Sequence, residues 1–155
     1  MQFLKTNIAK IALFIGLGGL IYFKLSNSKR FIKWYISKAY NTLVWKYADA
    51  IYRIETGNFT SNIFKHTKGA GVIAFKKYKP FGHRPKLFKG VATIGIYRSK
   101  NGLNYVRFLT LLDGYKFVAN YLTHSGYTLE KIRNRVKLFG SQNPDYLKII
   151  ENAIT

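Results

Sequence analysis

Apolar residues recur at helical spacing in two neighbouring segments near the start of the chain. Residues 42–54 place them at three- and four-residue steps, and this period predicts a helix with one buried face. Residues 29–41 alternate basic and aromatic positions, with apolar residues along one side of a predicted helix: Phe31, Ile32, Tyr35, Ile36 and Tyr40. This connector helix suits either a membrane surface or packing against the following domain, and the pattern does not choose between them.

The middle of the chain changes to short β-prone runs. Residues 69–75 and 91–97 are rich in β-branched and small apolar residues. Asn101-Gly102, within residues 98–109, is a strong signal for a β-hairpin turn. The stretch 76–86 is basic and contains two of the three prolines, so we expect an exposed loop there.

Helical signals return in the last third. Asp113 and Thr128 can cap two helices, and Asn143 followed by Pro144 can start another. The order of elements is therefore helices, a β-rich lobe, and helices again, which predicts an α+β domain.

An apolar run from Ile11 to Phe23 precedes these elements. Because Lys10 can extend its charge to the lipid headgroups, a transmembrane helix from about Leu4 to Leu25 is feasible. No small-residue cleavage pattern follows, which favours an uncleaved anchor over a cleaved signal. Basic residues on both sides leave the orientation open. We expect residues 1–28 to be an anchor with a basic flank, and a lipid membrane to be a partner.

Charge dominates the composition, with 26 Lys and Arg against six acidic residues and a net charge of +20. Such a chain attracts polyanions, and nucleic acid, anionic lipid and the bacterial cell wall all qualify. An AT-rich genome would also raise the basic and aromatic counts without a function behind them. There is no cysteine, and the three histidines lack a ligand spacing, so we expect no metal and no cofactor.

Three stretches carry a resemblance to a known family. Residues 48–64, "ADAIYRIETGNFTSNIF", end a predicted helix in Glu55-Thr56-Gly57, and residues 68–75, "KGAGVIAF", form a glycine-containing turn. They resemble the lysozyme-like superfamily, in particular lytic transglycosylases and bacterial glucosaminidases. The later "YVRFLTLLDGYKFVANYL…GYTLEKIRN…NPDYLKII" is similar to the carboxy-terminal half of phage-encoded lysozyme-like structural proteins, so the resemblance covers about residues 42–154. The Met-Gln pair typical of the transglycosylase turn is replaced by Ile73-Ala74, and the glucosaminidase Asn-Asn-x-Phe-Gly stretch is missing, which puts the glycan-groove contacts in doubt.

The resemblance implies a glycan-cleaving site. Glu55 corresponds to the catalytic glutamate at the end of a helix, and Tyr146 to a tyrosine that lies near it. The implied substrate-binding residues are Thr56, Ser61, Ala70, Gly71, Val72 and Tyr146. Helix capping is an equally good explanation for Thr56, and turn formation a better one for Ser61. For Glu55 the alternative is an ordinary surface acid paired with Arg53 or Lys65.

The scarcity of acids bears on the mechanism. Two-carboxylate glycosidases need a second acid, yet none occurs between Glu55 and Asp113. This favours one residue acting first as acid and then as base. The resemblance supplies such a chemistry, because lytic transglycosylases use the N-acetyl group and 6-hydroxyl of the sugar. Asp113 or Asp145 could instead supply a second carboxylate.

The sequence therefore predicts a connector helix at 29–41 and a lysozyme-like catalytic domain at 42–155, behind a membrane anchor. The expected function is cleavage of peptidoglycan glycan strands, and the resemblance implies a phage-encoded, virion-associated protein at a virion membrane or bacterial envelope, with other virion proteins as partners. Two alternatives remain: a non-catalytic basic structural subunit of a virion or organellar assembly, and a nucleic-acid binder. We expect no specific nucleic acid because no reading motif is present.

Overall fold

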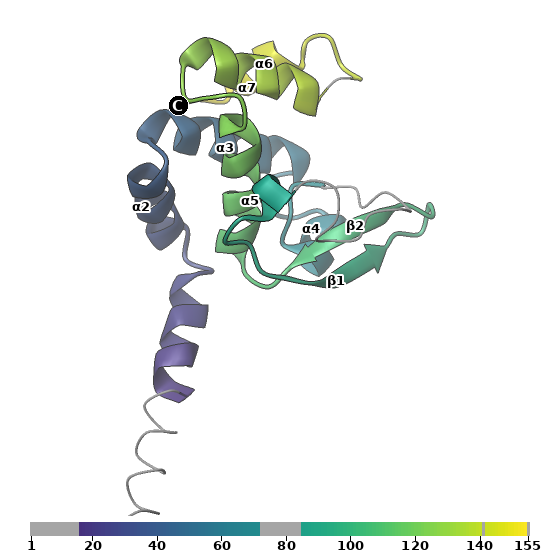
Figure 1. Ribbon diagram of the computed structural model, residues 1–155. Helices are drawn as coiled ribbons and strands as arrows, with labels where there is room; N and C mark the ends of the chain where they lie inside the picture. Colours follow the sequence, from purple (N-terminus) through teal and green to yellow (C-terminus); the bar gives the residue numbers. More distant parts are fainter. Residues whose placement is uncertain (1–15, 72–84, 141, 155) are drawn as a thin grey trace, which may run out of the picture.

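The computed structural model describes residues 16–71, 85–140 and 142–154 (Figure 1). After a helical stretch at residues 16–25 come α2 (Lys29–Ala39), α3 (Thr42–Glu55), α4 (Asn62–Thr67) and the short 3₁₀ helix η1 (Pro85–Phe88). The hairpin β1 (Thr93–Arg98) and β2 (Asn104–Phe108) follows, and then α5 (Leu111–Thr123), α6 (Leu129–Phe139) and α7 (Tyr146–Asn152).

The core is built around the contact between α3 and α5. Tyr52 of α3 and Tyr115 of α5 are fully buried and stack with their ring centroids 4.0 Å apart. This approach requires Gly114, because a Cβ there would lie 2.0 Å from the Tyr52 hydroxyl and 2.6 Å from the carbonyl oxygen of Lys68. The two helices therefore meet where α5 has no side chain.

The connector α2 packs on this body. Ile32 and Ile36 are fully buried in the shared core, whereas Trp34 on another side of the helix is 57% exposed. The sequence pattern allowed this helix either to lie at a membrane surface or to pack against the domain, and in the structure it packs against the domain.

The two strands form an antiparallel hairpin beside the helices (Figure 1). Ile96 pairs with Val106, and Gly102 in the turn has φ +81°, a conformation that glycine adopts without strain. The hairpin predicted from Asn101-Gly102 is thus present. Its two strands are the only ones in the described part of the chain.

The predicted fold class, an α+β lysozyme-like domain behind a transmembrane helix, is wrong. The described residues are mostly helical, and residues 69–71 of the first β-prone run are not a strand. Gly69 is instead packed against Phe108, whose ring a Cβ at position 69 would approach to 2.7 Å. β-propensity is a weak local preference, and tertiary packing overrides it here.

The described residues also contradict the predicted membrane-spanning helix. Among the residues described, no helix has both the length and the apolar character needed to cross a bilayer. The helical stretch that begins at residue 16 in the described chain ends at Leu25, since Ser26 and Asn27 both donate side-chain hydrogen bonds to the carbonyl oxygen of Phe23. Residues 1–15, which hold the rest of the predicted span, lie outside the described part.

Candidate active site at the end of helix α3

Glu55 is the last residue of α3 and is exposed to solvent. The helix ends here because the buried Thr56 hydroxyl donates to the carbonyl oxygen of Tyr52 at 2.5 Å and accepts from the amide of Phe59 at 2.8 Å. Gly57 then turns the chain with φ +54°. These local bonds fix the backbone position of the acid.

Tyr146 reaches Glu55 from the far end of the sequence. Its hydroxyl donates a hydrogen bond of 2.5 Å to Glu55 Oε1. Burial, and then the neighbouring Glu55 carboxylate, raise the pKa of Tyr146 well above its usual value. The phenol therefore stays protonated at neutral pH and serves as a lasting hydrogen-bond donor to the acid.

The tyrosine ring is held by its own neighbours. Phe139 stacks on it with centroids 6.4 Å apart, and the side chain of Tyr146 is buried. Gly140 gives the ring its space, because a Cβ at that position would lie 2.1 Å from the ring. Sequence reasoning missed Gly140, although a glycine just before the "NPDY" stretch was a signal that could have drawn attention to it.

Gly71 faces the other oxygen of the acid. A Cβ built on Gly71 would lie 3.7 Å from Glu55 Oε2, and the glycine has φ +66°. Oε1 accepts the hydrogen bond from Tyr146, whereas Oε2 accepts none from the described residues. The structure thus brings together Glu55, Gly71 and Tyr146 of the predicted site.

Glu55 has no cationic partner among the described residues, despite the net charge of +20. Arg53, suggested as its partner, pairs instead with Asp49, its Nε lying 3.3 Å from Asp49 Oδ2. Lys65, the other suggested partner, forms no ion pair within the described residues.

Three other residues predicted to bind substrate have structural roles in the fold. Thr56 closes α3 and is fully buried. Ser61 is the N-cap of α4, where its hydroxyl accepts from the amide of Phe64 at 3.2 Å. Ala70 lies in the core at 1% exposure. Val72 lies outside the described residues.

The two candidate second carboxylates differ. Asp113 closes a capping box on α5, with Oδ2 accepting from the amide and hydroxyl of Thr110 and Oδ1 from the amide of Ala92. Asp145 is exposed at the N-cap position of α7, directly before Tyr146, and makes no side-chain capping bond. Asp113 is therefore committed to the local fold, whereas Asp145 is available to solvent.

Metal ligation has no support in the part of the chain that is described. No three His, Asp or Glu side chains cluster there in a way that could hold an ion. The end of α3 presents an exposed carboxyl group that accepts a hydrogen bond from a buried phenol. No protein-family model, curated protein or solved structure matches this chain.

Proposed function

We propose that this chain cleaves the glycan strands of peptidoglycan, with Glu55 as the general acid and then the general base. One observation carries the proposal: a buried tyrosine, remote in sequence, donates a 2.5 Å hydrogen bond to an exposed glutamate that has no cationic partner among the described residues. The resemblance of residues 48–64 and 68–75 to lytic transglycosylases supports the choice of substrate.

The chemistry requires only one carboxyl group. Protonated Glu55 donates a proton from Oε2 to the glycosidic oxygen, and the bond between that oxygen and C1 of the N-acetylmuramic acid breaks. The N-acetyl oxygen stabilises C1 while the positive charge develops. The 6-hydroxyl of the same sugar then attacks C1 and gives its proton to Glu55, so that the acid is regenerated and an anhydro sugar forms without water.

The placement of the other acids supports a single-carboxyl mechanism. Asp49 and Glu151 are in ion pairs, with Lys29 and Arg53 in one case and Arg133 in the other. Asp113 is used in helix capping. Glu130 and Asp145 are exposed and have no ion pair among the described residues; of the two, Asp145 directly precedes Tyr146 and could activate water instead, which would make the protein a hydrolase.

Release of soluble muropeptides from purified cell walls tests the proposal. We expect wild-type protein to release products and Glu55→Gln to reduce the initial rate by at least about a hundredfold, because the amide cannot donate the proton in the bond-breaking step. Glu130→Gln is the matched control, since Glu130 is an exposed acid in the first turn of α6. This variant should keep the wild-type rate.

The products decide between the two reaction types. Mass spectrometry should find anhydro ends if the 6-hydroxyl attacks C1, and reducing ends if water attacks. A folded wild-type protein that releases nothing from the walls of its own host, or a Glu55→Gln variant as active as wild type, would contradict the proposal. The first result would leave a structural role for the chain.

A further inference from the structure

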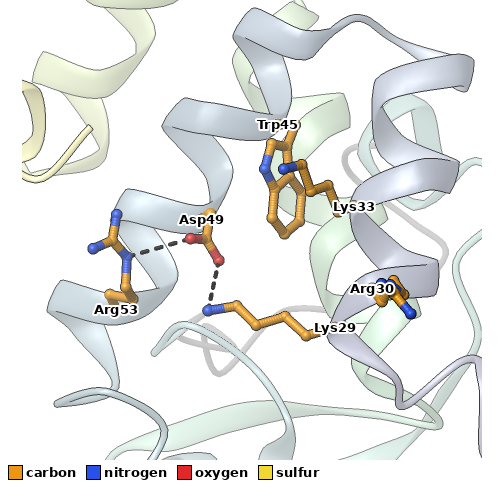
Figure 2. Close-up of a pocket in the computed structure, with 6 residues that line it drawn as sticks. All are labelled: Lys29, Arg30, Lys33, Trp45, Asp49 and Arg53. Carbon is orange, nitrogen blue, oxygen red and sulfur yellow. Dashed lines mark ion pairs between the residues drawn. The ribbon is translucent and has the colours of Figure 1, made fainter. Parts of the chain in front are cut away.

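An open hollow of about 480 Å³ lies between α2 and α3, and none of the residues predicted for glycan cleavage lines it. Figure 2 shows Asp49 in this hollow with Arg53 on one side and Lys29 on the other. The lining residues are Lys29, Arg30, Lys33, Trp45, Asp49 and Arg53.

Positive charge exceeds negative charge in the hollow. Four cations and one carboxylate line it, which leaves three positive charges without a counterpart in the lining. Asp49 is already engaged, because Lys29 Nζ lies 3.2 Å from Oδ1 and Tyr115 donates a hydrogen bond to the same oxygen at 2.8 Å. Arg30 and Lys33 are exposed and have no acidic partner among the described residues.

The start of α2 adds to this excess. Lys29 and Arg30 occupy its first turn, which has no acidic residue, and the N-cap Ser28 makes no side-chain capping bond. The partial positive charge of the helix dipole at this end repels the two cations. A bound anion would offset both the repulsion among the cations and the unfavourable position of Lys29 and Arg30.

An exposed apolar surface leads directly into this cationic end. The helical residues 16–25 project from the body (Figure 1), and Leu17, Leu20 and Ile21 are each more than half exposed. The turn that follows is fixed to α5, because the carbonyl oxygen of Ser26 accepts from the amide of Leu112 at 2.9 Å. A fixed turn thus joins the exposed apolar helix directly to the cationic start of α2.

We propose that the hollow binds the phosphate of anionic lipid headgroups at a bilayer surface, while the exposed apolar side chains of residues 16–25 contact the acyl layer. Cations beside apolar side chains match the two layers of a membrane surface, and the exposed Trp34 on α2 suits its interface. A nucleic acid would satisfy the cations but not the apolar side chains. The proposal is independent of catalysis by Glu55.

Vesicle co-sedimentation of the full chain tests this binding. Vesicles of phosphatidylcholine with 30% phosphatidylglycerol should bind the wild-type chain more tightly than phosphatidylcholine alone. We expect Arg30→Gln with Lys33→Gln to weaken binding to the anionic vesicles roughly 30-fold. Both side chains are exposed and in no ion pair among the described residues, so the fold should be retained.

A charge-matched control separates a site from general attraction. Lys137→Gln with Lys148→Gln removes the same charge from exposed positions on α6 and α7, at the other end of the molecule from residues 16–25 (Figure 1). Its binding should stay within about threefold of wild type. Equal losses in the two double variants, or no preference for anionic vesicles, would overturn the proposal.

The apolar contribution has its own pair of variants. Leu20→Asn should weaken binding to both kinds of vesicle, because Leu20 is 68% exposed on the helix that precedes α2. Leu138→Asn, at 58% exposure on α6, should bind as wild type does. Unchanged binding of Leu20→Asn would contradict contact with the acyl layer.

Inorganic phosphate and DNA distinguish the other sources of phosphate. Titration calorimetry without vesicles should show no saturable binding of sodium phosphate, compared with sodium chloride at equal ionic strength, if the ligand is a lipid. Saturable binding of inorganic phosphate that Arg30→Gln with Lys33→Gln abolishes, with vesicle binding unchanged, would instead make the hollow a site for the free ion. Loss of DNA retention in Arg30→Gln with Lys33→Gln, with vesicle binding unchanged, would assign the hollow to nucleic acid. Either result would overturn the lipid proposal.

Discussion

At the scale of single residues, the candidate active site depends on one long-range hydrogen bond. Tyr146 and Glu55 are separated by 91 positions in the sequence and lie 2.5 Å apart from oxygen to oxygen. Tyr146 keeps this place because Phe139 stacks on its ring and Gly140 leaves room for it. The bond leaves one oxygen of Glu55 beside Gly71, where a substrate can meet it.

Tyr146→Phe tests the positioning role of this hydroxyl. A hydrogen bond to a charged group contributes about 1.5–3 kcal/mol, so we expect kcat for wall cleavage to fall roughly 10- to 100-fold. KM should change little, because the glycan would still bind in the same place. The melting temperature should also stay close to that of wild type, since the ring remains in its packing site.

Steady-state rates with soluble glycan fragments would provide this separation of kcat from KM. A variant with wild-type kcat would show that the hydroxyl has no part in catalysis. A variant that loses kcat only through unfolding would be recognised by its circular dichroism spectrum.

At the scale of elements, the α3 and α5 helices are held together by aromatic stacking. Trp45 stacks on Tyr115 with centroids 5.4 Å apart, and Tyr115 stacks on Tyr52 at 4.0 Å. The Tyr52 hydroxyl also donates to the carbonyl oxygen of Lys68 at 3.3 Å, which ties the loop before Gly71 to α3. The same contact that forms the core therefore also positions one side of the candidate site.

Gly114→Ala should disturb this contact. The added methyl group would overlap the Tyr52 hydroxyl, and overpacking of this kind costs about 1–3 kcal/mol of unfolding free energy. Urea unfolding would measure the loss. Gly19→Ala is the matched control, because it adds a methyl group to a helical glycine with no atom within 4 Å and should not lower stability. Equal stability of Gly114→Ala and wild type would show that the helices can move apart without cost.

At the scale of the whole molecule, hydrogen bonds from a buried and a half-buried tyrosine connect distant parts of the chain. Tyr47 in α3 donates to Glu151 Oε1 in α7 at 2.9 Å, and Tyr40 donates to Asn120 Oδ1 in α5 at 2.7 Å. Burial, with the hydrogen bond to Glu151 second, raises the pKa of Tyr47 to about 12. Burial likewise raises the pKa of Tyr40 to about 12.

These tyrosines make the fold sensitive to alkaline pH. Their stabilising contribution is fully present below pH 10, the ordinary pKa in the unfolded chain, and is lost as pH rises from 10 through 12. Urea unfolding at pH 8, 10, 11 and 12 should show this decline. Tyr47→Phe should show a shallower decline, and because both proteins carry the same lysines, the difference isolates the tyrosine. Parallel declines would contradict the raised pKa of Tyr47.

Local signals in the sequence predicted much of the secondary structure. The helical period of residues 29–54 led to α2 and α3, Thr128 is the N-cap of α6, and Asn101-Gly102 marks the hairpin turn. Capping signals failed where two nearby residues could each start the helix. Thr110 rather than Asp113 is the N-cap of α5, and Asp145 rather than Asn143 is the N-cap of α7. The short α4 was missed because its six residues carry too little pattern.

The sequence was enough to predict roughly where most of the helices lie and where the hairpin turns, because capping, periodicity and turn geometry act between residues a few positions apart. The tertiary structure was needed to show that Tyr146 meets Glu55, that α2 packs on the body and that four cations line the hollow in which Asp49 pairs with Lys29 and Arg53. These contacts join residues far apart in the chain, and they depend on side-chain packing such as the space left by Gly114 and Gly140, which no local pattern specifies.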